Sequence, residues 1–96
     1  MAEEIQDPIA PSAIEHAVDE AWEAGKQLYR YNYLDYHFES FRAYCRARSY
    51  ADSFEKVMIF GPFAARHDVT ATSAPDLLDA VTAYLNRRFQ RVERSY

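Results

Sequence analysis

The sequence predicts a mainly α fold, a small single-domain helical bundle of three to four helices. Its 96 residues fit one hydrophobic core, because chains divide into separate domains only above roughly 250 residues. Hydrophobic residues make up 49% of the chain and charged residues 27%, a balance typical of globular domains. In the first and last thirds of the chain, apolar side chains recur every three or four residues, as in an amphipathic helix.

The domain is expected to begin after a short leading segment. Residues 1–11 combine Pro8 and Pro11 with acidic and small residues and show no apolar period. They are therefore predicted to form a flexible N-terminal arm, and residues 12–96 a single globular domain.

A first helix is expected to begin at Ser12. Ser12 and Glu15 have the spacing of a capping box, in which each side chain accepts a hydrogen bond from a backbone N–H of the first turn. The apolar stripe that follows continues to about residue 31 and contains Ile14, Ala17, Val18, Ala21, Trp22, Leu28 and Tyr29.

The middle of the chain fits two periods. Apolar and polar residues alternate from Phe41 to Arg48, as in a strand, whereas a helical stripe runs through Leu34, Phe38, Phe41 and Cys45. We favour a helix to about residue 50, because Ala and Arg favour helices. The alternative is an α+β fold, helix, β-meander and helix, with residues 36–72 as strands.

A last helix is expected from Ser73, where Pro75 and Asp76 form a typical helix start. Its apolar positions are Leu77, Leu78, Val81, Tyr84, Leu85, Phe89 and Val92. The shared helical period predicts a core of Ile14, Val18, Trp22, Phe38, Phe41, Leu78, Val81 and Leu85. Truncating Trp22 would then cost about 3–5 kcal/mol.

The sequence contains no pattern that indicates catalysis. Cys45 is its single cysteine, and only Gly25 and Gly61 are available for a phosphate-binding or dinucleotide-binding loop. None of the three histidines has the Glu-x-x-His spacing of a di-metal helix bundle. We therefore predict no enzyme activity, no catalytic residue, no metal and no cofactor.

The expected location is cytoplasmic, with no membrane association. No apolar stretch approaches the roughly 20 residues that cross a bilayer as a helix. The first residues are acidic and lack the apolar region of a secretory signal.

The aromatic residues point to protein binding. Eleven of the fourteen Tyr and Phe residues lie between Tyr29 and Phe63, more than one core stripe hides, and Tyr and Arg are common in interfaces. We predict a non-catalytic protein-binding domain, an accessory subunit or inhibitor of a larger protein, with a homodimer also possible. It would bind through an acidic first helix and a Tyr/Arg-rich surface, with contacts from Asp19, Glu20, Glu23, Tyr31, Tyr33, Tyr36, Arg42, Arg46 and Tyr50.

Two other function classes stay open. The acidic first helix could imitate nucleic-acid phosphates and inhibit a nucleic-acid-processing complex, as anti-CRISPR and other anti-defence proteins of phages do. The second open function class is a very small oligomeric enzyme. Direct nucleic-acid binding is disfavoured, because the chain carries a formal net charge of -4.

Overall fold

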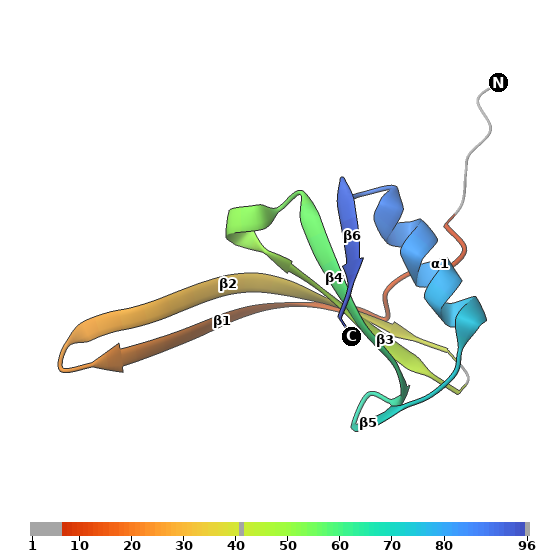
Figure 1. The fold of residues 1–96 in the computed structure, drawn as a ribbon, viewed down its shortest axis with the longest axis horizontal. Helices are drawn as coiled ribbons and strands as arrows, with labels where there is room; N and C mark the ends of the chain where they lie inside the picture. Colours follow the sequence, from red (N-terminus) through yellow and green to blue (C-terminus); the bar gives the residue numbers. More distant parts are fainter. Residues whose placement is uncertain (1–6, 41, 96) are drawn as a thin grey trace.

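Six strands and one α-helix make up the computed structural model, which describes residues 7–40 and 42–95. Strands β1 to β5 pair antiparallel in sequence order, and β6 pairs parallel with β4, so all six belong to one sheet. The helix α1 lies against one side of that sheet (Figure 1). The elements are β1 (Ala13–Glu23), β2 (Lys26–Glu39), β3 (Tyr44–Tyr50), the 3-10 turn η1 (Ala51–Ser53), β4 (Lys56–Ala65), β5 (Asp68–Ala71), α1 (Pro75–Asn86) and β6 (Arg91–Arg94).

The predicted helical bundle is therefore wrong, first of all at its N-terminal helix, where β1 and β2 form a long hairpin. Ile14, Val18 and Trp22 are four residues apart. Four residues are two strand repeats and nearly one helical turn, so both structures place these side chains on one face. The hairpin turns through Ala24 and Gly25, whose φ angles of 51° and 76° are the positive values of a type I′ turn.

The helix predicted to about residue 50 is also wrong. In β3, Cys45 and Ala47 are fully buried in the core, whereas Arg46 and Arg48 point to the opposite side. In a helix, Arg46 and Arg48 would lie closer to the apolar core than they do in a strand. The alternation of apolar and polar residues along β3 therefore predicted this segment better than the helical stripe did. The alternative α+β prediction, with strands over residues 36–72, agrees better with the structure, since β3, β4 and β5 lie within that range. Its first helix is nevertheless wrong, because β1 and β2 occupy that part of the chain.

The helix predicted after Ser73 is confirmed as α1, although it ends at Asn86 and Val92 belongs to β6. Of the predicted core, Phe38, Val81 and Leu85 are fully buried, and Leu78 packs against them half-buried. The prediction was wrong for three residues that are 42–59% exposed, and Phe41 lies outside the described residues. Those three are Ile14, Val18 and Trp22.

The sheet has two distinct faces. We call the side that carries α1 the helix face; its core side chains include Phe38, Cys45, Ala47 and Ile59. We call the other side the open face. The sheet curls around the open face, so that Arg66, in the turn between β4 and β5, forms an ion pair with Glu15 of β1. The curl buries polar residues there without any helix above them.

One end of the hairpin extends beyond the rest of the molecule. Strand β3 pairs with β2 only from Tyr33 onward, so residues 18–32 form a two-stranded ribbon without a third strand (Figure 1). The radius of gyration is 15.4 Å and the longest dimension 56 Å. A compact domain of this length has a radius of gyration of about 12.5 Å. We refer to residues 18–32 as the ribbon.

The N-terminal segment is described only from Asp7 onward. The Asp7 carboxylate pairs with Arg87 at 2.7 Å and Arg88 at 2.8 Å, and these hydrogen bonds lower the pKa of the Asp7 carboxyl. Ile9 packs against the core. Residues 7–11 therefore contact the domain.

Candidate functional site

The open face contains a paired carboxylate and guanidinium. Arg48 donates two hydrogen bonds to Asp35, from Nε at 2.8 Å and from an Nη atom at 3.0 Å. The Arg48 guanidinium also lies 4.0 Å from the centre of the Tyr33 ring. These hydrogen bonds raise the pKa of Arg48. Both charges are thus neutralised within the protein, and the pair is suited to holding β2 against β3.

A second polar group is built around His37. The Tyr44 hydroxyl lies 2.5 Å from His37 Nδ1, and Glu15 Oε1 lies 3.1 Å from Nε2 without being aligned for a hydrogen bond. Burial, followed by the charge of Arg66, lowers the pKa of His37, and burial raises the pKa of Tyr44. With His37 neutral, the Tyr44 hydroxyl donates to Nδ1. Both side chains are more than 90% buried, so a substrate has little access to them.

We expect stability to fall as the pH drops below about 6.5, because His37 has a folded-state pKa below its ordinary value of 6.5. The unfolded chain binds this proton at a higher pH than the folded chain, so acidification favours unfolding. Urea midpoints at pH 7.5 and 5.5 measure the effect. His37→Gln should remove most of the difference, whereas His67→Gln, in the exposed β4–β5 turn, should retain it. Equal midpoints for the wild type would contradict the prediction.

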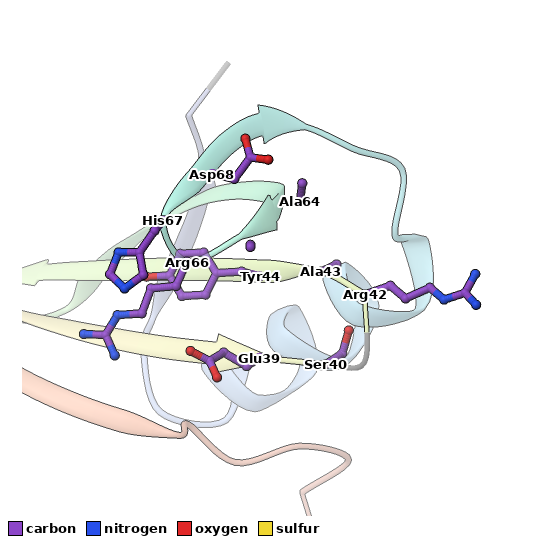
Figure 2. A pocket seen from close by; sticks show the side chains of 10 residues that line it. Glu39, Ser40, Arg42, Ala43, Tyr44, Ala64, Arg66, His67 and Asp68 are labelled. Carbon is purple, nitrogen blue, oxygen red and sulfur yellow. The ribbon is translucent and has the colours of Figure 1, made fainter.

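A hollow of about 420 Å³ opens beside this group, at the rim of the sheet (Figure 2). Glu39, Tyr44, Arg66 and His67 contribute polar groups to its lining, but the guanidinium of Arg42 points away from it. Arg66 is already paired with Glu15. Acidic and basic groups are mixed, so the hollow has no marked preference for a ligand charge.

Neither a reactive thiol nor a metal centre is evident in residues 7–40 and 42–95. Cys45 is fully buried under α1, and burial raises the pKa of its thiol to about 11, so the unreactive protonated form dominates at neutral pH. No three His, Cys, Asp or Glu side chains of these ranges are grouped as metal ligands. Within the same ranges, no helix has the length and apolar character needed to cross a membrane.

The ribbon differs from the rest of the molecule because its large apolar side chains are uncovered. On the helix face, Trp22 near the turn is 59% exposed and Val18 is 42% exposed. Leu28, at an irregularity in the strand pairing beside the turn, is also 59% exposed. Toward the body, Ile14 and Leu34 continue the same face and are 52% and 37% exposed. The face that forms the core beneath α1 thus extends along the hairpin without a covering layer.

Tyrosines line the opposite face of the ribbon and its base. Tyr29 and Tyr31 lie on β2 with their ring centres 5.4 Å apart. Tyr50, at the end of β3, contacts Tyr31 and Tyr33 edge to face, at 6.0 and 5.6 Å. The four rings support one another and leave Tyr29 and Tyr31 more than 40% exposed.

The structure brings Tyr31, Tyr33 and Tyr50 together, as three members of the predicted contact set. Tyr36 lies on the other face and packs edge to face on Phe89. Arg46 stacks over the ring of Phe60 at 5.0 Å on the open face.

The other predicted contact residues lie apart from this cluster. Arg42 lies in the loop between β2 and β3, beside the rim hollow. Asp19, Glu20 and Glu23 are exposed on the ribbon. The predicted acidic helix is wrong, and in a strand Asp19 and Glu20 point to opposite faces.

Sequence reasoning missed Trp22, Leu28 and Val18 as surface residues. Two signals were available. Tyr29, Tyr31 and Tyr33 alternate with Arg30 and Asn32, which is the two-residue period of a strand. The small residue and glycine at positions 24 and 25 are also compatible with a two-residue hairpin loop.

Comparisons with protein-family models, with curated proteins and with solved structures found nothing that matches this chain.

Proposed function

We propose that this protein is a non-catalytic protein-binding domain whose ribbon is its main contact with another protein chain. The observation that supports this proposal is the exposure of Trp22 and Leu28, 59% each, at the end of a ribbon that extends from the body. Tryptophan is among the residues that contribute most to binding energy in protein interfaces. An accessory subunit or an inhibitor would both use such a surface.

The energetics of the ribbon favour this function. A two-stranded hairpin is marginally stable by itself, because few of its side chains are buried. Burying a large apolar side chain contributes about 1.5–3 kcal/mol, so covering Trp22 and Leu28 would stabilise the ribbon and the complex together. The acidic side chains of Asp19 and Glu23, on the opposite face of the same strand, can increase the rate of association with a basic surface.

Site-specific crosslinking tests the proposal. A photoreactive phenylalanine analogue is placed at position 22, at position 28, or at position 69 as a control, in cells that produce the protein naturally. Val69 in β5 is 73% exposed but lies away from the ribbon. We expect protein crosslinks from positions 22 and 28 and few from position 69. Equal yields at all three positions would contradict a specific binding role for the ribbon.

A further inference from the structure

The outer edge of β1 is an unpaired strand edge. Strand β1 stands first in the sheet order and, among the described residues, pairs only with β2. Its 11 residues include no proline or glycine, and the extra residue at the irregularity in the hairpin, Leu28, belongs to β2. Alternate residues of an edge strand direct their backbone N–H and C=O groups outward, where another strand can pair with them. The whole length of β1 therefore offers such a template.

The charges on β1 restrict which strand can pair with it. Its acidic residues are Glu15, Asp19, Glu20 and Glu23. Like charges directly opposite each other destabilise a pair of strands. A two-fold axis at right angles to the sheet would set a second copy of β1 antiparallel beside the first. Each residue then lies opposite a residue on the same face, and the residue at the axis lies opposite itself.

The register centred on Val18 suits this pairing. Val18 is the middle residue of β1, so this register aligns all 11 residues of the two strands. It sets no two acids opposite each other: Glu20 lies opposite His16, Glu15 opposite Ala21, Asp19 opposite Ala17, and Glu23 opposite Ala13. A register centred on Ala17 sets Glu15 opposite Asp19, and one centred on Asp19 sets that carboxylate opposite itself. Registers centred farther from Val18 align fewer residues.

The same register brings exposed apolar side chains together. Trp22 lies opposite Ile14 of the other copy, and Val18 lies opposite Val18. These side chains are 59%, 52% and 42% exposed in the single chain. Pairs of aromatic and branched side chains on adjacent strands stabilise a sheet. Ile14 itself pairs with Tyr36, which packs against the core, so the ribbon of each copy lies beside the body of the other.

We propose that two copies of this chain pair their β1 strands edge to edge and antiparallel, with the two-fold axis beside Val18. This inference rests on the proposed function and names the partner. The two sheets become one continuous sheet, with α1 of each copy on the same side. The ribbon, which has two strands in the single chain, gains a third. Glu15 keeps its ion pair with Arg66, because Ala21 opposite it is small.

Charges placed at the axis test this register, with the dimer dissociation constant measured by sedimentation equilibrium. Val18→Asp alone and Val18→Lys alone should each weaken self-association about 10-fold or more, because each variant meets its own charge across the axis. An equimolar mixture should form a heterodimer about 10-fold tighter than either variant alone. Val69→Asp is the matched control, in β5 at the other end of the sheet order, and should leave the dimer intact. Circular dichroism should show an unchanged fold for every variant.

Ala17 distinguishes edge pairing from packing of two helix faces. It lies on the open face, opposite Asp19 of the other copy in the proposed register. Ala17→Asp should therefore weaken self-association about 10-fold, whereas Ala17→Lys should retain it, because only the first sets like charges opposite each other. A dimer that responds to the Val18 variants and not to Ala17→Asp would overturn edge pairing.

A wild-type chain that stays monomeric at high concentration would overturn the inference, as would a mixture of the two Val18 variants that does not recover. The identity of the crosslinked chain keeps this result separate from the proposed function. If the chain is monomeric and position 22 crosslinks to a different protein, the proposed function stands and only the choice of partner fails. Crosslinks from position 22 to a second copy support both.

Discussion

Phe38→Ala is expected to lower the free energy of unfolding by about 3–5 kcal/mol. Phe38 is fully buried on the helix face of β2, and its ring meets Tyr84 of α1 edge to face at 5.3 Å. Truncation leaves a cavity between the sheet and α1, so the sheet and the helix both lose packing contacts. The loss is a large part of the 5–15 kcal/mol typical of a domain. Urea denaturation measures it.

Trp22→Ala provides the comparison for Phe38→Ala. Trp22 was predicted to be a core residue, with a similar cost of truncation, but its 59% exposure changes that expectation. Exposed positions usually change stability by about 0.5 kcal/mol or less. Similar losses for the two variants would contradict the assignment of Phe38 to the core and Trp22 to the surface.

Arg48→Met is the second variant with a large expected effect, about 3 kcal/mol of lost stability. It removes both hydrogen bonds from the Asp35 carboxylate, which is only 9% exposed and therefore poorly hydrated. The cost comes mainly from leaving that charge without a partner. Adding Asp35→Leu should recover most of the loss, because an apolar pair does not leave a buried charge. Thermal and urea denaturation of the wild type, the two single variants and the double variant give the coupling free energy.

An exposed ion pair serves as the control for Arg48→Met. Lys56 Nζ lies 3.2 Å from Glu93 Oε2, with side chains 40% and 35% exposed. Lys56→Met should cost less than about 1 kcal/mol, because water solvates the remaining carboxylate. If Arg48→Met costs no more than this control, the Asp35 pair does not hold β2 and β3 together as argued.

The candidate site was only partly predictable because exposure depends on three-dimensional packing. The excess of tyrosines between Tyr29 and Phe63 indicated an aromatic surface, and the cluster of Tyr31, Tyr33 and Tyr50 agrees with it. Trp22 could not be placed outside the core from its spacing, because amphipathic core residues and uncovered strand residues have the same pattern. His37 and Tyr44 meet only because β2 pairs with β3.

By itself, the sequence determined the last helix and the burial of Val81 and Leu85, because a Pro-Asp start followed by an apolar helical stripe is typical of an amphipathic helix. The burial of Phe38 was predicted correctly, although the helical stripe on which that prediction rested is a strand in the structure. The tertiary structure decided that the apolar stripe of residues 13–23 belongs to a strand. A four-residue apolar spacing fits both a helix and a strand, so pairing with neighbouring strands has to decide between them. Tertiary packing also decided which apolar stripe stays exposed: α1 is twelve residues long and covers only the body of a sheet that extends beyond it.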